Sequence, residues 1–498
     1  MNASPAARLF AHGGVYTLSR LSNLVVGVVL LPLYARQLGP DGFGVISLMT
    51  TVGAFLGLLM VQGLPASWFR LRFDEPDAAG VRSLESTIVW YLAASGLVFL
   101  AVLTLFGEPL ARRVTPGIPY LPLGLLTAIA AFANAFPSLY ERKLQVDERP
   151  IAFGIFNLSR TILSAGLVVL FVVALRRGAR GAIEATALAA GLAAVASLGL
   201  IRPGWFRRGS KKRLSRSLTY GLPLVPHSLA GMTNDVIDRL LLNAMLGLSA
   251  VGVYSMGYRL AAMGQVVAVS LNQAYSPAFI RTVNAAETSR RDGDAATADA
   301  ALRRVGRLGL LTVAGVSCVV LAICAVAREA IMVLATPAFS DSWRVVAPVG
   351  AGVVAWACYF PFSQSIFYNP RRVRWMIVVT GAAALTNIGA NLMLIPKWGI
   401  MGAASATLVS DVVLALVAYR LGQSSTPIPY QRGRWFAALA CVAAGLVGLW
   451  AIDARLDALW PRVLMKILWA AAAAGLTLRA AQVNPGALRQ FWSRKDVP

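Results

Sequence analysis

The chain has 498 residues, 57% of them hydrophobic and only 14% charged, and its mean hydropathy is +0.65. Soluble domains carry about a quarter charged residues, so this composition excludes a soluble globular protein and indicates a polytopic membrane protein. The formal net charge of +24 would suggest nucleic acid binding in a soluble chain, but here the basic residues lie in short connections between apolar segments.

Apolar windows of about 20 residues, the length that a helix needs to cross a bilayer, follow one another along the chain. We predict an all-α polytopic membrane protein with about fourteen transmembrane helices. In chain order the expected spans are 13–36, 43–68, 85–107, 119–140, 151–175, 182–202, 217–246, 251–279, 306–327, 344–367, 374–395, 400–421, 435–452 and 463–481. The first span contains Arg20 and Asn23 and precedes no small-residue cleavage site, so we expect a retained helix rather than a signal peptide.

Most basic residues fall in every second connection between these spans. Arg and Lys accumulate in cytoplasmic loops, so the alternation predicts that both termini are cytoplasmic. Arg112/Arg113 and the group Arg176, Arg177 and Arg180 lie in the opposite connections and are exceptions. We interpret the basic loops as topology signals and contacts for anionic lipids rather than as a nucleic acid site.

The cysteines and histidines do not form a metal motif. Cys318, Cys324, Cys358 and Cys441 all lie inside predicted spans without CxxC spacing, which is typical of small packing residues in membrane helices. The only histidines, His12 and His227, are far apart in the sequence. We therefore expect neither a disulfide nor a metal site.

Two sequence patterns occur twice. LGPDGFGVIS, which contains Gly39 and Gly44, returns 208 positions later as LGLSAVGVYS, which contains Gly247 and Gly252. The pattern G-x-x-G-A-x-x-A-T, at 178–186, returns at an offset of 221 as 399–407. By the span list the offset is six helices, so both copies enter the membrane with the same polarity.

We therefore predict two parallel six-helix repeats related by an axis along the membrane normal. The N-lobe covers residues 1–210 (helices 1–6) and the C-lobe covers 211–425 (helices 7–12). Residues 426–498 hold two further helices, 13 and 14, and a cytoplasmic tail. This architecture is typical of transporters that place a central cavity between two lobes and open it to each side in turn.

Polar residues recur at helical spacing in the first helix of each predicted copy and in the eighth helix. Ionisable groups at membrane depth cost at least about 2.5–3.5 kcal/mol, so they normally face a cavity or a partner. The polar positions in the first helix are His12, Tyr16, Ser19, Arg20, Asn23 and Gly27, and in the seventh His227, Gly231, Asn234, Asp235 and Asp238. The eighth helix adds Tyr254, Tyr258, Arg259, Gln265, Asn272, Gln273 and Ser276.

These positions predict a net-cationic cavity for a phosphorylated ligand. Arg20, Arg239 and Arg259 supply guanidinium groups, which bind phosphate oxygens in bidentate fashion. Its polar lining is predicted to comprise Asn23, His227, Asn234, Asp235, Asp238, Tyr254, Tyr258, Asn272 and Gln273. Two alternatives remain: Asp235 and Arg239 are spaced i, i+4 for a structural salt bridge, and Asp235 or Asp238 could carry a coupling proton or bind Na⁺.

The segment ARQLGPDGFGVIS, the block from YGLPLVPHSL to VYSMGYRL, and NLMLIPKWGIMGAASAT resemble one transporter family. They are similar to the polysaccharide-transporter branch of the multidrug/oligosaccharidyl-lipid/polysaccharide exporter superfamily, which includes O-antigen and other lipid-linked oligosaccharide flippases. The likeness spans roughly Tyr16 to Arg420. Arg36 matches the family's Arg before Leu-Gly, and Asp238-Arg239 matches its Asp-basic pair.

The resemblance implies a flippase of the bacterial cytoplasmic membrane that moves an undecaprenyl-pyrophosphate-linked glycan outward by alternating access. It adds Arg36 to the substrate-binding residues. It implies a polyprenyl-diphosphate-linked glycan and membrane lipids as partners, with a glycan polymerase or biosynthesis complex as a further one. Lipid II flippases also have fourteen helices, and there the last pair helps to form a groove for the lipid tail, which gives a hypothesis for the last two spans here.

Three other functions compete with this interpretation. A multidrug exporter would be expected to have an acidic cleft, against which the intramembrane arginines argue, whereas a lipid II-type flippase would use the same cationic cavity. A membrane glycan polymerase or glycosyltransferase usually has larger external loops with catalytic groups. The sequence contains no GxxxxGK[ST], HExxH or GxSxG, so we expect transport without catalysis and no cofactor beyond an H⁺ or Na⁺ gradient.

Overall fold

The computed structural model describes residues 5–201, 209–369 and 371–482, except for the side chains of residues 5–25, 227, 230 and 233–235. The described part is built of helices joined by short turns. The helices are α1 (Pro5–Val61), α2 (Leu64–Leu71), α3 (Ala78–Val114), α4 (Leu125–Ala133), α5 (Ala135–Val146), α6 (Pro150–Val169), α7 (Gly178–Ile201), α8 (Lys211–Gly221), α9 (Leu224–Leu246), α10 (Leu248–Arg291), α11 (Ala295–Leu334), α12 (Ser342–Tyr368), α13 (Met376–Trp398), α14 (Ile400–Ser425), α15 (Arg432–Arg455) and α16 (Leu459–Ala480).

Each predicted span falls on one of these helices or on adjoining ones. Helix α1 contains the first span and most of the second, and it bends between them at Gly39. Within the described residues, eleven helical segments are long and apolar enough to cross a membrane. The protein is therefore an all-α multi-pass membrane protein. Helices α9 and α10, which hold the predicted polar stripes, are not among the eleven.

The two repeated patterns adopt matching backbone conformations. Gly39 has φ 63° and ψ −175°, and its repeat mate Gly247 has φ 86° and ψ 179°. Only glycine adopts this region without strain, so each copy needs glycine at its corner. The second pattern also begins with a glycine of positive φ in both places, since Gly178 and Gly399 have φ values of 60° and 57°.

The two corners also make the same contact with each other. A Cβ atom at Gly44 would overlap the carbonyl of Leu248, and a Cβ atom at Gly252 would overlap the carbonyl of Pro40. The offset of 208 positions takes Gly44 to Gly252 and Pro40 to Leu248, so it exchanges one contact for the other. Such a reciprocal pair is what a local two-fold axis produces, and it lets α1 and the start of α10 approach to backbone contact.

Contacts along the chain define two compact units, Met1–Val253 with Leu334–Ala338 and Tyr254–Val333 with Phe339–Pro498. In the first unit, the α2–α3 turn is joined to α8 by ion pairs. Arg213 donates to Glu75 through Nε at 3.0 Å and Nη2 at 2.7 Å, and Arg216 pairs with Asp74. At the buried Glu85, the Lys143 ammonium lies 2.6 Å from the carboxylate. These contacts fix the basic ends of the helices to one another.

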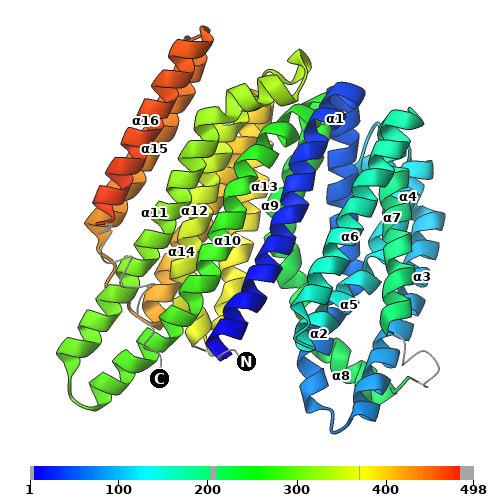
Figure 1. Ribbon diagram of the computed structural model, residues 1–498, viewed down its shortest axis with the longest axis horizontal. Helices are drawn as coiled ribbons and strands as arrows, with labels where there is room; N and C mark the ends of the chain where they lie inside the picture. The colour runs from blue at the N-terminus through cyan, green and yellow to red at the C-terminus, as the bar shows by residue number, and fades with distance from the viewer. Residues whose placement is uncertain (1–4, 202–208, 370, 483–498) are drawn as a thin grey trace. The chain divides into compact units, whose positions relative to one another are not determined.

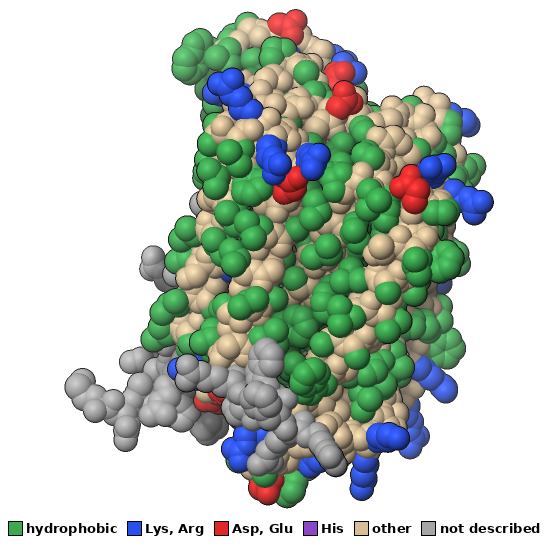
Figure 2. Space-filling model, turned by 90° about the vertical axis from the view of Figure 1, so that its right-hand side faces the viewer, with side chains coloured by type: hydrophobic (Ala, Val, Ile, Leu, Met, Phe, Trp, Pro, Cys, Tyr) green, Lys and Arg blue, Asp and Glu red, His purple; other side chains and the backbone are tan. Residues whose placement is uncertain are grey.

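The surface has the banding that a membrane protein requires. Figure 2 shows hydrophobic side chains over the middle of one face, with Lys, Arg, Asp and Glu gathered toward its two ends. A bilayer about 30 Å thick solvates such a band, and its charged borders lie in water or among headgroups.

In the second unit, α12, α13 and α14 pack closely, and α15 and α16 form an antiparallel pair (Figure 1). Small residues let the two helices pack closely. A Cβ atom at Gly445 would lie only 2.7 Å from the Ala473 methyl group, so there is no room for a larger residue. The Trp469 indole donates to the Gly445 carbonyl at 3.0 Å. The last two helices are therefore a hairpin of their own, and α15 lies beside α12.

The predicted boundaries of the N-lobe, the C-lobe and the C-terminal pair stay predictions. The contact units divide the chain within α10, whereas the predicted lobes divide it by sequence repeat.

Candidate functional site

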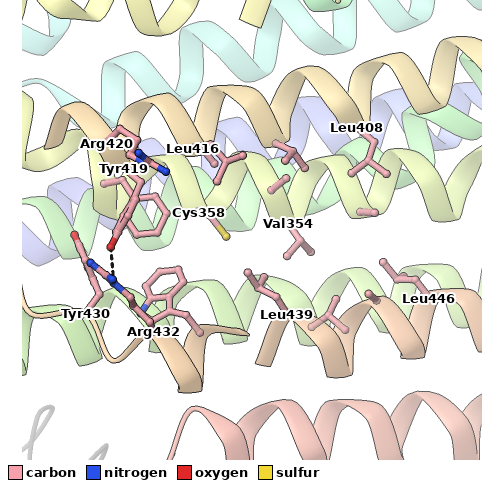
Figure 3. A pocket seen from close by; sticks show the side chains of 18 of the residues that line it. Val354, Cys358, Leu408, Leu416, Tyr419, Arg420, Tyr430, Arg432, Leu439 and Leu446 are labelled. Carbon is pink, nitrogen blue, oxygen red and sulfur yellow. Dashed lines mark hydrogen bonds between the residues drawn. The ribbon is translucent and has the colours of Figure 1, made fainter. Parts of the chain in front are cut away.

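A groove of about 890 Å³ lies between α12, α14 and α15 in the second unit. Its wall is mostly aliphatic, and Figure 3 shows Val354, Leu408, Leu439 and Leu446 along its length. Cys358 contributes its sulfur to the same wall. Such a lining suits an apolar chain rather than a polar solute.

Polar groups gather at one end of this groove. Arg420 near the end of α14 and Arg432 at the start of α15 are both exposed and line it (Figure 3). The Nε of Arg432 donates to the Tyr419 hydroxyl at 3.0 Å, which holds the guanidinium across the groove mouth. Gln423 lines the same end.

The α14–α15 connection is a compact turn that places these groups. The Gln423 amide donates to the Ile428 carbonyl at 2.8 Å and accepts from the Ile428 N–H at 3.1 Å, so one side chain closes the turn. The Tyr430 hydroxyl donates to the Pro361 carbonyl at 3.0 Å. Desolvation by burial raises the pKa of Tyr430 well above its usual value, so the hydroxyl stays protonated and keeps donating.

Four aromatic rings form the floor under this polar end. The Phe362 ring lies 5.1 Å from those of Tyr419 and Tyr430 and 4.9 Å from that of Trp435, centroid to centroid. These separations are typical of attractive ring pairs. The Trp435 side chain is buried, with 6% exposed, and its indole Nε1 has no hydrogen-bond partner among the described residues.

The other end of α15 has a different polar cluster, which we call the closed cluster because each of its charges is paired within it. The buried Lys466 and Arg462 of α16 pair with Glu329 of α11 and Asp453 of α15. Lys466 Nζ lies 2.9 Å from Asp453, and Arg462 Nε lies 2.9 Å from Glu329. Arg462 Nη1 also donates to the Leu456 carbonyl at 3.1 Å, near the last turn of α15. Two acids thus neutralise two bases, which fixes the hairpin to α11.

A third polar group lies between α13 and α14. Asn387, Asn391 and Ser410 are buried, and Asn391 Nδ2 donates to the carbonyl and side-chain oxygens of Asn387 at 2.9 and 3.1 Å. Ser410 Oγ donates to the Ala383 carbonyl at 3.0 Å. Asp411 is buried on the next position of α14. Polar side chains at this depth join helices or serve transported ions.

Comparison with known proteins decides the family. The profile of the family described as polysaccharide biosynthesis protein matches residues 9–283, more than half of the chain. The chain belongs to this family. The comparison with curated proteins found no match.

The fold of this family member is similar to that of several transporters of known structure. Lipid II flippase MurJ in an inward closed conformation matches with a TM-score of 0.69 at 13% identity, over 97% of this chain and 100% of that one. An inward-facing MATE family multidrug transporter of the MOP superfamily matches with 0.59 at 15% identity, over 82% and 94%. The Vibrio cholerae MATE transporter VcmN in its bent form matches with 0.51 at 16%, over 84% and 96%. The family member thus has the fold of MOP transporters.

The residues predicted to line the cationic cavity are only partly described. The side chains of Arg20, Asn23, His227, Asn234 and Asp235 lie outside the described residues. In the first unit, Arg36 is exposed just before the α1 bend. Asp238 and Arg239 of α9 are buried.

The other predicted residues lie on α10 in the second unit. Tyr254 and Tyr258 are buried, with ring centroids 5.7 Å apart, and Arg259 is half-buried. Asn272 accepts from Gln364 Nε2 of α12 at 3.2 Å, whereas the adjacent Gln273 is exposed. The structure thus joins Asn272 to a partner on α12 that the sequence did not indicate, and the cavity itself stays a prediction.

The groove residues Arg420, Arg432 and Trp435 were not predicted as a site. Arg420 lies at the end of one predicted span and Arg432 lies just before the next, both at the basic side. Arginines are common there, so their presence does not indicate a binding site. The sequence does indicate the closed cluster in part. Lys466 lies inside an apolar window, where an ionisable residue needs a partner.

Proposed function

We propose that this polysaccharide biosynthesis protein is a flippase for an undecaprenyl-pyrophosphate-linked oligosaccharide, a precursor of cell-surface polysaccharide. It would move this lipid across the bacterial cytoplasmic membrane by alternating access, without chemical change. The observation that carries the proposal is the groove between α12, α14 and α15, which is apolar along its length and cationic at one end. A polyprenyl diphosphate has the same division into a long apolar chain and an anionic head.

The proposed transport path uses two parallel six-helix lobes around a central cavity, with helices 13 and 14 outside them. The matched glycine conformations at Gly39 and Gly247, and at Gly178 and Gly399, support a duplicated unit. Arg20, Arg239 and Arg259 would receive the diphosphate, while the glycan follows the hydrated cavity. An H⁺ or Na⁺ gradient would drive the cycle through a buried carboxylate, for which Asp235 and Asp238 are the candidates.

The hairpin α15–α16 would guide the lipid tail. Its first helix, α15, forms one wall of the groove, so the tail could remain against protein while the head crosses. Neither Trp450 nor Trp469 lines the groove, whereas Leu439 and Leu446 do. A photoreactive residue at Leu439 or Leu446 is therefore better placed than one at either tryptophan to label a polyprenyl probe.

The proposed orientation places both termini in the cytoplasm. The ends of α2, α3 and α8 that meet around Glu75 and Arg213 are rich in basic residues, and so is the α12–α13 turn with Arg371 and Arg374. Cytoplasmic ends of membrane helices have this composition. Partners would be the lipid-linked glycan, membrane lipids and enzymes of glycan assembly.

A second candidate is a flippase of the lipid II type. It is favoured by the match to MurJ, which extends over the whole of that chain and so includes the last helices of this one. The same groove and the same cationic cavity would serve lipid II, because it too is a polyprenyl diphosphate.

Deletion of the gene tests the proposal and separates the two candidates. We expect a polyprenyl-linked oligosaccharide to accumulate on the inner leaflet, identified by mass spectrometry of extracted lipids, and surface polysaccharide to disappear. Accumulation of a peptidoglycan precursor instead would favour the second candidate. Unchanged lipid-linked sugars would exclude both.

A further inference from the structure

We propose that the polar end of the groove is a docking site for the phosphate of a polyprenyl lipid in the leaflet at the basic ends of the helices. The site consists of Arg420, Arg432, Trp435 and the Tyr419 hydroxyl. It is separate from the cationic cavity predicted on α1, α9 and α10. The choice of a polyprenyl lipid rests on the proposed function, whereas binding of a lipid phosphate rests on the groove alone.

The positive charge of this end is not balanced by acidic side chains of the described residues. Arg420, Arg432 and the adjacent Arg434 form no ion pair within the described residues, although sixteen ion-pair contacts occur elsewhere in that part of the chain. Arg432 is positioned by the neutral Tyr419 hydroxyl rather than by a carboxylate. A phosphate between two guanidinium groups would accept charge-assisted hydrogen bonds from both.

A buried donor in the groove lacks an acceptor. Trp435 Nε1 has no hydrogen-bond partner among the described residues, and Trp435 lies in the first turn of α15. Buried donors are nearly always satisfied by protein, water or a ligand. Because Trp435 lines the groove, an oxygen of a bound ligand is a candidate acceptor for its indole N–H.

The rest of the groove defines the kind of lipid. Figure 3 shows leucine and valine side chains beyond the arginines and no charged group among the residues drawn there. The ligand must therefore be anionic at one end only and apolar beyond it. The choice of an isoprenoid chain over the acyl chains of a phospholipid rests on the proposed function, and phosphatidylglycerol is therefore one of the probes below.

The position of the site gives it a role. Arg420 and Arg432 end α14 and begin α15 at the basic side of the second unit, as do Arg371 and Arg374 of the α12–α13 turn. Phosphates of inner-leaflet lipids lie at this depth. A polyprenyl phosphate would dock there with its tail already in the groove, before its head enters the transport path or after the glycan has been removed.

Binding of undecaprenyl phosphate to the purified full-length protein in nanodiscs tests the proposal. Neutral undecaprenol and phosphatidylglycerol are the competing probes, and inorganic phosphate is a probe without a tail. We expect the wild type to bind undecaprenyl phosphate at least tenfold more tightly than the other three. In the variant Arg420→Gln/Arg432→Gln, we expect that preference over undecaprenol to fall at least about tenfold, the effect of losing charged hydrogen bonds.

The control is Arg371→Gln/Arg374→Gln, which removes the same charge from exposed arginines at the same side of the unit. It should leave undecaprenyl phosphate binding unchanged. Trp435→Phe keeps an aromatic ring, although a smaller one, and removes the N–H donor, and we expect it to weaken binding about threefold to tenfold.

Several results would overturn the proposal. They are equal affinity for undecaprenol and undecaprenyl phosphate, equal affinity for phosphatidylglycerol, and equal loss in the control variant. The first would mean that only the tail is bound, the second that the groove holds ordinary bilayer lipid, and the third that the effect is general surface charge.

The outcome is independent of the gene deletion described above. If deletion leaves lipid-linked sugars unchanged, the proposed function fails, yet arginine-dependent binding of the lipid phosphate can still be measured. If deletion causes accumulation but the arginine variant binds normally, the docking site fails and the flippase proposal stands.

Discussion

The two ends of α15 both carry basic side chains, but they differ in whether acidic side chains balance the charge. At its final turn, Asp453 and Glu329 neutralise Lys466 and Arg462, and every one of these charges has a partner. At its first turn, Arg432 and its neighbours have no acidic partner among the described residues. Charge balance therefore separates a cluster that holds helices together from one that is prepared for a ligand.

The difference also predicts which property a substitution changes. The closed cluster fixes α15 and α16 to α11, whereas Arg420 and Arg432 are exposed at the groove mouth and pair with no acid among the described residues. Substitutions in the closed cluster should therefore change stability, and those at the groove end should change binding.

The largest effect is expected for Lys466→Met. The ammonium is fully buried, and its removal leaves Glu329 and Asp453 with one base instead of two. Breaking a buried pair costs about 3–5 kcal/mol, so the apparent Tm in detergent should fall strongly. Lys466→Arg, which keeps the charge, is the control. An unchanged Tm for Lys466→Met would break the comparison, because the closed cluster would then contribute nothing.

A smaller loss is expected for Glu329→Gln. This carboxylate accepts from both Arg462 and Lys466, and its side chain is 19% exposed, so water can replace part of what is lost. We expect about 1–3 kcal/mol, seen as a Tm shift between those of Lys466→Arg and Lys466→Met. A shift as large as that of Lys466→Met would mean that Asp453 alone cannot hold the remaining charges.

Stability should be nearly unaffected in Arg420→Gln/Arg432→Gln. Both side chains are exposed, and the one recorded hydrogen bond is to Tyr419, so the expected change is within about 0.5 kcal/mol. The Tm is measured on the same preparation as lipid binding. A fall comparable to that of Glu329→Gln would show that these arginines are structural and would remove the contrast between the two ends.

The smallest effect concerns the exposed ion pairs of the first unit. The hydrogen bond from Arg70 and the charge of Arg216 lower the pKa of Asp74 below its usual 3.8. The ionised form is thus favoured by folding, so its contribution is present above pH 3.8 and is lost as the pH falls through the lowered value. Hydrogen exchange of α8, corrected for intrinsic rates, should rise slightly in that range. Asp74→Asn should show no such change, and an identical rise in both would exclude Asp74 as the cause.

Much of the fold could be predicted because its signals are local. Gly39 and Gly247 mark corners that need a glycine conformation, and the chain bends at both. Apolar windows placed the helices, although α1 continues through a bend that the span list treated as a break. The ion pairs of the closed cluster could not be predicted, because Lys466 and Glu329 are 137 residues apart and no sequence pattern pairs them.

The groove could not be predicted for a different reason. Leu408, Leu439 and Leu446 face a cavity, but in a membrane helix an apolar side chain that faces lipid looks the same in the sequence. The predicted cationic cavity rests on Arg20, whose side chain lies outside the described residues, and on Arg239 and Arg259, which belong to different units. The arginines most plainly placed for an anion are instead Arg420 and Arg432.

The crossed contact of Gly44 with Leu248 and Gly252 with Pro40 makes the two glycine corners one joint. A methyl group at either glycine would push against the backbone of the opposite corner and separate α1 from the start of α10. Each corner supplies the surface on which the other must fit, so a substitution at one glycine would need a compensating change in the other segment.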